Sequence, residues 1–226
     1  MKQIIFSTLM VKAILDGNKT QTRRVFNPQP TIGMVFDEIS LCPIVADKSK
    51  ASGERIAKGA YAIFVNRADD GYYGETFAYK SRYEVGDILY VREGMFKNQE
   101  DEYGYMADEP DWKLWEYTGI PSIHMPKDAA RLFLKVTDLK VEWLHEILNH
   151  PFDMKKEGTT LDYPDSHYSM ASGVNCLRNK FIELWDSINA KHGYPWESNP
   201  WVWVYEFERV EKPEGMERNG EKRIAD

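Results

Sequence analysis

The sequence predicts an α+β domain built round a small β-barrel, with helices at its side and inserted hairpin or loop segments. Of its 226 residues, 42% are hydrophobic and 13% aromatic, which is enough to form one substantial core. Several strand-like stretches are separated by loops and a few helical stretches, without the regular alternation that predicts a parallel sheet. No apolar run reaches the length of a membrane-spanning helix, so we expect no membrane partner. We expect one domain over residues 1–210.

The N-terminal part begins with a predicted helix over residues 8–16. A serine and a threonine can cap its start, apolar residues recur at helical spacing, and Gly17 ends it. A strand is expected over residues 20–26, ended by the Asn-Pro-Gln-Pro sequence that follows. Residues 31–82 are glycine-rich and indicate an insertion that carries a hairpin or two. Its strand-like pieces are residues 60–65 and 76–79.

The rest of the chain alternates strands with irregular segments. Strands are expected over residues 88–93, after a Gly-Asp turn, over residues 131–136 and on towards residue 143, and over residues 201–208. Residues 97–119 are acidic and aromatic and predict a second insertion, a long loop or lid. Apolar residues at helical spacing over 177–188 predict an amphipathic helix. Residues 211–226 are charged and almost free of apolar side chains, which predicts a flexible tail.

The charge balance narrows the choice of partners. A net charge of −7 and a pI near 5.4 argue against broad binding of duplex DNA. Lys19, Arg23 and Arg24 nevertheless form a local basic spot, whereas residues 97–119 concentrate acidic side chains. This distribution favours a small anionic or nucleoside ligand over a long polyanion. Because the chain has only two cysteines and too short an N-terminal apolar run for a secretory signal, we expect reduced thiols and a cytoplasmic location.

The most informative segment is residues 17–24, Gly-Asn-Lys-Thr-Gln-Thr-Arg-Arg, where the predicted helix gives way to a strand. It brings a potential base, a potential nucleophile and anion-binding guanidinium groups close together. Alternation along the strand places Thr22 and Arg24 on one face and Arg23 on the other. Lys19, at the turn, is free to curl toward Thr22. A solvated basic turn is the plainer interpretation of the same residues.

The remaining candidates carry weaker signals. The histidines of residues 145–150 are spaced one residue too far apart to share a helix face, so we expect no metal. No phosphate-binding loop of the Walker type is present, and we expect no cofactor. Ser122 and His124 lie in a turn between two prolines, which indicates either a ligand loop or a structural turn. Arg92 and Glu93 are either part of a pocket or an ion pair at a barrel rim.

Residues 6–24 resemble the opening of ASCH-domain proteins of the PUA-like superfamily. The remainder is similar to the long form of these proteins that tailed phages and prophages often encode. The matching pieces follow in the expected order over about half of the chain. They are residues 86–93, 122–126, 131–136, 157–158, 184–185 and 199–203. The resemblance implies a six-stranded or similar β-barrel, with a cleft lined by the lysine–threonine turn.

Small bacterial acetylcytidine amidohydrolases, which also look like ASCH domains, use a lysine, a threonine three residues later and a glutamate. The resemblance aligns these with Lys19, Thr22 and Glu157. It implies metal-independent hydrolysis of an amide on the amino group of a modified cytidine. The substrate would also meet Arg23, Arg24, Arg92, Glu93, Ser122 and His124. The small enzymes lack both insertions, either of which could reshape or cover the pocket.

In such a mechanism Lys19 acts as a neutral base, because burial and the charges of Arg23 and Arg24 lower its pKa from about 10.4 toward roughly 7–8. Thr22 attacks the acyl carbonyl and forms an ester, and Glu157 gives a proton to the departing amine. Arg24 or backbone N–H groups stabilise the oxyanion.

Two other functions use the same residues. A binding module for RNA or a modified base would keep Lys19 protonated, hold phosphate with Lys19 and Arg24, and read a base amino group with Glu157. RNA cleavage, associated with the wider family, would need a metal cluster or a His–Lys pair, and His124 is the only plausible histidine for such a pair. The expected partner is a modified nucleoside, or single-stranded RNA or a nucleobase. It would be met in the host cytoplasm if the chain is phage-encoded.

Overall fold

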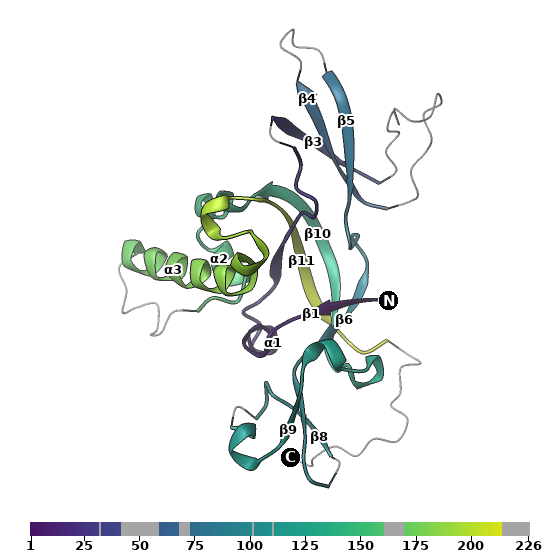
Figure 1. Ribbon diagram of the computed structural model, residues 1–226, viewed down its shortest axis with the longest axis vertical. Coiled ribbons are helices and arrows are strands. Elements are labelled where there is room, and N and C mark those ends of the chain that lie inside the picture. Colours follow the sequence, from purple (N-terminus) through teal and green to yellow (C-terminus); the bar gives the residue numbers. More distant parts are fainter. Residues whose placement is uncertain are drawn as a thin grey trace.

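The structure is a computed structural model that describes residues 1–31, 33–41, 59–67, 73–100, 102–109, 111–160 and 170–213. It is an α+β structure in which the described strands form three separate sheets (Figure 1). The predicted α+β class is therefore confirmed. Most of the predicted tail lies outside the described residues, which end at residue 213.

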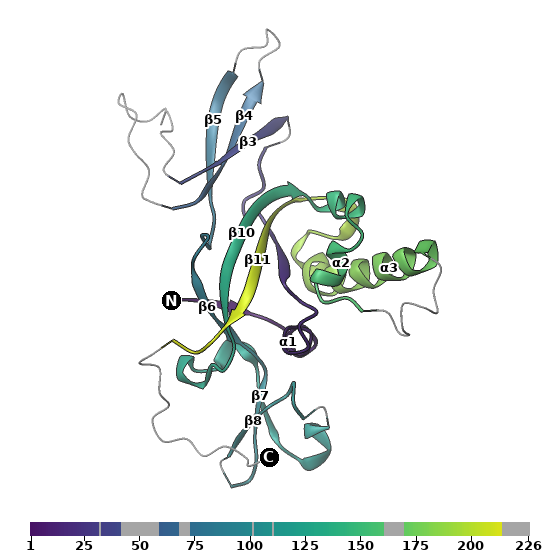
Figure 2. The ribbon, with the colours of Figure 1, turned by 180° about the vertical axis from the view of Figure 1, so that it is seen from behind.

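The central sheet has five strands in the order β1-β6-β10-β11-β2. They are β1 (Lys2–Ile5), β6 (Ile88–Arg92), β10 (Phe133–Trp143), β11 (Trp201–Val210) and β2 (Gln21–Val25). Only β1 and β6 pair in parallel; the other pairs are antiparallel. Strands β10 and β11 bend strongly together (Figure 2). The described strands do not close into a barrel, because β1 and β2 remain edge strands.

Strand β11 is apolar on both faces, and this explains why it lies inside the sheet. Trp201, Trp203, Tyr205 and Phe207 alternate with Val202 and Val204 along the strand. The aromatic face belongs to the main core, which also contains residues of β1, β6 and α1 (Thr8–Leu15). The valine face packs in a second core beneath α3 (Met170–Asn189). The sheet is therefore covered on both sides near β11 and β2.

Helix α1 connects β1 to β2 and follows the predicted signals closely. The Ser7 hydroxyl accepts a hydrogen bond from the Met10 N–H at the helix start, and Gly17, just past the helix end, has a φ of +75°. Further helical segments follow β10 in the chain. Besides α3 they include α2 (Asp153–Lys156) and the 3₁₀ turns η4 (Leu144–Asn149), η6 (Ala190–His192) and η7 (Trp196–Ser198). None of the helices in the described part is long and apolar enough to cross a membrane.

The first predicted insertion contains a three-stranded antiparallel sheet. Its strands are β3 (Met34–Ser40), β4 (Tyr61–Arg67) and β5 (Tyr73–Lys80), in that order. The sheet projects from one end of the molecule (Figure 1), but its base is part of the main core. The Phe64 ring makes edge contacts with Phe26 and Trp201, at centroid distances of 5.8 and 4.9 Å.

The second predicted insertion forms another small sheet at the opposite end (Figure 1). Its strands are β8 (Tyr103–Tyr105), β7 (Met95–Lys97) and β9 (Thr118–Ile120), with the 3₁₀ turn η1 (Trp112–Trp115) before β9. Two further turns, η2 (Ser122–His124) and η3 (Lys127–Ala129), lead into β10. The acidic segment that was expected as a long loop or lid thus contributes strands and a 3₁₀ turn to a small sheet.

Candidate functional site

The site begins where the chain passes from α1 to β2. The N–H groups of Asn18 and Lys19 both donate to the Ala13 carbonyl, at 2.8 and 2.9 Å, which ends the helix. The next N–H, of Thr20, donates to the Lys156 carbonyl at 2.9 Å, and Lys19 forms an antiparallel bridge with Glu157. The end of α2 is therefore joined to the start of β2 through the backbone. Lys19 and Glu157 lie side by side although 138 residues separate them.

Gly158 makes this close approach possible. It adopts a φ of +91°, which disfavours any residue with a side chain. A Cβ atom at this position would lie 3.0 Å from the Cβ of Ala13 and 3.4 Å from the Cβ of Lys19. The Glu-Gly pair noted in the sequence is thus needed both for the turn after α2 and for its packing against Lys19.

The Lys19 ammonium group is completely buried and fully hydrogen-bonded. Its Nζ atom donates to the Gln21 carbonyl at 2.8 Å, to the Glu157 carbonyl at 2.7 Å and to Glu157 Oε2 at 3.2 Å. Burial lowers the pKa of Lys19, and the charges of Arg24 and Arg23 act in the same direction, while Glu157 opposes them. In the described part of the chain, Nζ makes no hydrogen bond to Thr22. The amine is directed to Glu157 and to the backbone of Gln21.

Glu157 continues a buried row of alternating charges. Its other oxygen, Oε1, accepts from Arg23 Nη1 at 2.8 Å, and Arg23 also pairs with Glu142 Oε1 through Nη2 at 2.7 Å and Nε at 2.9 Å. Burial raises the pKa of Glu142, and the Arg23 charge opposes that rise. We call Lys19, Glu157, Arg23 and Glu142 the lysine cluster. Glu142, on β10, was not singled out from the sequence.

Thr22 lies on the opposite face of β2 from Arg23. In the register with β11, Thr22 is opposite Tyr205 and Arg24 is opposite Trp203, so both face the main core. Within the described residues, the Thr22 hydroxyl has no hydrogen-bond partner. Thr22 lines a narrow cavity of about 30 Å³, enough for a water molecule, together with Arg23, Arg24 and Glu157. Because β2 is an edge strand, side chains from both of its faces reach this cavity.

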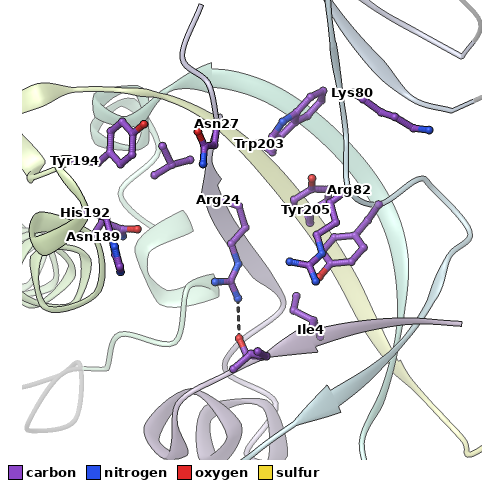
Figure 3. Close-up of a pocket in the computed structure, with 13 residues that line it drawn as sticks. Ile4, Arg24, Asn27, Lys80, Arg82, Asn189, His192, Tyr194, Trp203 and Tyr205 are labelled. Atoms are coloured by element: carbon purple, nitrogen blue, oxygen red, sulfur yellow. Dashed lines mark hydrogen bonds between the residues drawn. The ribbon is translucent and has the colours of Figure 1, made fainter. Parts of the chain in front are cut away.

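A larger pocket of about 630 Å³ adjoins the narrow cavity, and Arg24 and Asn189 line both (Figure 3). This volume is in the range of typical small-ligand sites. The other described residues that line it are Ile4, Ile5, Val25, Asn27, Lys80, Arg82, Tyr83, His192, Tyr194, Trp203 and Tyr205. The pocket therefore combines aromatic rings, side-chain amides and cations from the central sheet, the end of α3 and the segment after β5.

The tyrosines of this pocket are held in place by hydrogen bonds. The Tyr205 hydroxyl lies 2.9 Å from the Ser81 hydroxyl, and burial raises the pKa of Tyr205 to about 12. The Tyr83 hydroxyl donates to the Gln3 carbonyl at 2.6 Å, and burial also raises its pKa. Both phenols are therefore neutral at ordinary pH, and their rings form a fixed wall.

The four other predicted site residues lie elsewhere and line neither described cavity. Arg92 donates to the Ile123 carbonyl in η2 and, at 2.9 Å, to Gln3 Oε1. Glu93 accepts two hydrogen bonds from Arg131, each 2.9 Å long. In η2, Ser122 is half-buried and His124 is exposed.

Several pocket residues were not predicted from the sequence. Lys80 and Arg82 belong to a segment interpreted as an insertion. Asn189 is the last residue of α3, and His192 and Tyr194 come after it. A lysine and an arginine two residues apart at a strand end are a weak signal, because such charges are usually solvated. The described residues include no group of histidine, cysteine or acidic side chains arranged to hold a metal ion.

Comparisons with family models, with curated proteins and with solved structures found no match to this chain. The functional interpretation therefore depends on the residues of the site and on the sequence resemblance.

Proposed function

We propose that this chain is a metal-independent amidohydrolase of the ASCH, PUA-like type that removes an acyl group from the amino group of a modified cytidine. The observation that carries the proposal is the buried contact between Lys19 and Glu157 beside a Thr22 hydroxyl without a partner among the described residues. The narrow cavity would take the acyl group, and the larger pocket would take the base and sugar. The strongly curved central sheet would correspond to an opened PUA-like barrel.

The first step would create the base. A proton passes from the Lys19 ammonium to the Glu157 carboxylate along their 3.2 Å hydrogen bond, leaving a neutral amine and a neutral acid. Burial of Lys19 favours its neutral form, because desolvation penalises the ammonium charge. Arg23, paired with the other Glu157 oxygen at 2.8 Å, keeps the carboxyl group oriented during the transfer. One event thus supplies both the base and the acid that amide hydrolysis needs.

The second step would form a covalent ester. The Lys19 amine accepts the Thr22 hydroxyl proton while Thr22 Oγ1 bonds to the acyl carbon. The protonated Glu157 then gives its proton to the departing cytidine nitrogen as the C–N bond breaks. Backbone N–H groups of the turn before Thr22 would stabilise the oxyanion. Water then hydrolyses the ester, which releases the carboxylic acid and regenerates Thr22.

A non-catalytic reader of a modified base is the second candidate, and one observation favours it. All three N–H groups of the Lys19 ammonium already have acceptors, and none of these is Thr22. In a reader, the lysine cluster would be a permanent ionic support for the end of β2. The larger pocket would then bind the base without chemistry.

The test is a chromatographic assay of the purified chain with acetylcytidine and with its 5′-monophosphate, in the presence of a chelator. Thr22→Val and Lys19→Met should each reduce turnover at least about 1,000-fold, because each removes a reacting group. Thr20→Val is the matched control, since Thr20 is exposed in the same turn. Circular dichroism checks that each variant is folded.

Two outcomes would reject this mechanism. Turnover by a folded Thr22→Val variant at the wild-type rate would exclude Thr22 as the nucleophile. Binding of both compounds without any conversion would favour the reader.

A further inference from the structure

The wall of the larger pocket differs in charge from the rest of the chain. The chain contains 36 acidic and 29 basic residues, yet the described wall includes three cations, Arg24, Lys80 and Arg82, and no carboxylate. A pocket lined by charges of one sign focuses the field and attracts ligands of the opposite sign. The pocket is therefore suited to an anionic ligand.

Two of these cations lie close together without a carboxylate between them. Arg24 donates to the Ile5 carbonyl at 2.9 Å through Nη2, and among the described residues no ion pair joins Arg24 or Arg82 to a carboxylate. Burial lowers the pKa of Arg24; Tyr83 and the charge of Glu157 oppose this shift, whereas the charge of Arg82 adds to it. In Figure 3 the Arg82 side chain extends toward Arg24. A bound anion would relieve this repulsion and receive charge-assisted hydrogen bonds from both guanidinium groups.

The opposite side of the pocket has a different chemical character. Figure 3 shows Asn189, His192 and Tyr194 across Arg24 from Arg82 and Lys80. Asn189 also lines the narrow cavity that contains Thr22. A ligand that fills the pocket would thus have an uncharged, hydrogen-bonding part near Asn189 and an anionic part near Arg82.

We propose that the ligand is a nucleotide, with its phosphate held between Arg24 and Arg82 and its base directed toward Asn189 and the narrow cavity. The identity of the base rests on the proposed function, whereas the phosphate site rests on the charges of the pocket. Lys80 also lines the pocket, at the end of β5, and its Nζ atom lies over the Tyr61 ring, 5.7 Å from the ring centroid. A mononucleotide suits a bounded pocket in a chain of net charge −7 better than a long RNA does.

The test is isothermal titration calorimetry of the full chain with cytidine, cytidine 5′-monophosphate, inorganic phosphate and a short cytidine oligoribonucleotide. The monophosphate should bind at least about tenfold more tightly than cytidine, because hydrogen bonds to a charged group are stronger than neutral ones. Arg82→Ala should remove most of that advantage and leave cytidine binding unchanged. Arg209→Ala is the control, because Arg209 is an exposed arginine outside both cavities.

The outcomes separate this inference from the proposed function. Equal affinities for cytidine and its monophosphate, with turnover of acetylcytidine, would overturn the phosphate site and leave the hydrolase intact. Arg82-dependent binding of the monophosphate without any turnover would support the phosphate site and reject the hydrolase. Tighter binding of the oligoribonucleotide than of the monophosphate would overturn the mononucleotide in favour of RNA. If no compound binds, both proposals fail.

Discussion

Two buried ion-pair clusters lie in the part of the chain that the structure describes, and their difference shows what distinguishes a candidate site from a structural support. The lysine cluster joins α2 and β10 to β2 through Lys19, Glu157, Arg23 and Glu142. The second, which we call the arginine cluster, consists of Arg131, Glu93 and Asp108, with the Tyr105 ring 3.9 Å from the guanidinium carbon. Both contain a carboxylate that is almost completely buried.

The arginine cluster has the features of a structural support. The Arg131 guanidinium makes two parallel hydrogen bonds to Glu93 and stacks on a ring, which is the geometry that arginine favours. Desolvation opposes its charge, but Glu93 and Asp108 together raise the pKa of Arg131. It cannot lose a proton at ordinary pH.

The lysine cluster differs in proton chemistry and in surroundings. Lysine can become neutral, and burial lowers the pKa of Lys19. Glu157 also lines a cavity that contains the Thr22 hydroxyl, whereas neither Glu93 nor Arg131 lines the described cavities discussed above. Burial and ion pairing alone therefore do not indicate a functional site. A titratable base, a nucleophile and an accessible cavity do so together.

The largest expected effect compares the loss of each central carboxylate. Glu157→Ala leaves the completely buried Lys19 without its carboxylate and removes one of the three carboxylates, Glu142, Asp153 and Glu157, that pair with Arg23, so the free energy of unfolding should fall by about 3–5 kcal/mol. Glu93→Ala should cost about 3 kcal/mol, the lower end of that range, because the Arg131 side chain is 19% exposed and keeps Asp108. Urea denaturation measures both. A greater loss for Glu93→Ala would contradict this ranking of the clusters.

The second effect is the pH dependence of stability, which should have opposite signs in the two clusters. The pKa of Lys19 is lowered by burial, so between that pKa and about 10.4 the unfolded chain binds more protons. The wild-type free energy of unfolding should rise with pH through this window relative to Lys19→Met. The pKa of Glu93 is raised by burial, so just above about pH 4.3 the folded chain binds more protons. There the wild-type free energy should fall as pH rises, relative to Glu93→Gln.

Urea denaturation at a series of pH values provides both comparisons. Arg131→Met is a control at alkaline pH, since an arginine does not titrate in that range and the difference from wild type should stay constant. A Lys19→Met variant whose stability follows wild type at every alkaline pH would show that Lys19 keeps the pKa of free lysine.

The smallest effect separates reactivity from stability at two buried threonines. The Thr22 hydroxyl has no partner within the described residues, so Thr22→Val should change the free energy of unfolding by less than about 0.5 kcal/mol while abolishing turnover. The Thr159 hydroxyl donates to the Met154 carbonyl, so Thr159→Val should cost about 1 kcal/mol. Thermal unfolding and the acetylcytidine assay on both variants make the comparison. A Thr22→Val variant less stable than Thr159→Val would indicate a structural role for Thr22.

The sequence by itself determined the local features of this protein. The cap at Ser7, the helix stop at Gly17, the Glu-Gly turn at the end of α2 and the alternating faces of β2 depend on neighbours within a few residues. The strand β11 was equally predictable from the sequence, because a strand buried on both faces has apolar residues at nearly every position. Such signals predict elements and the faces on which side chains lie.

Only the tertiary structure decided what each face meets. Alternation along β2 places Arg23 and Thr22 on opposite faces of the strand. The carboxylates that pair with Arg23 come from distant parts of the chain, Glu142 from β10 and Glu157 from the end of α2. In the tertiary structure, the segment expected as a long loop or lid contributes strands to the small sheet β8-β7-β9. The central sheet keeps two edge strands, β1 and β2. It also placed Arg82, from the segment interpreted as an insertion, beside Arg24. The physical reason is that strand order and long-range ion pairs depend on which surfaces pack together, and that is set by the free energy of the whole core.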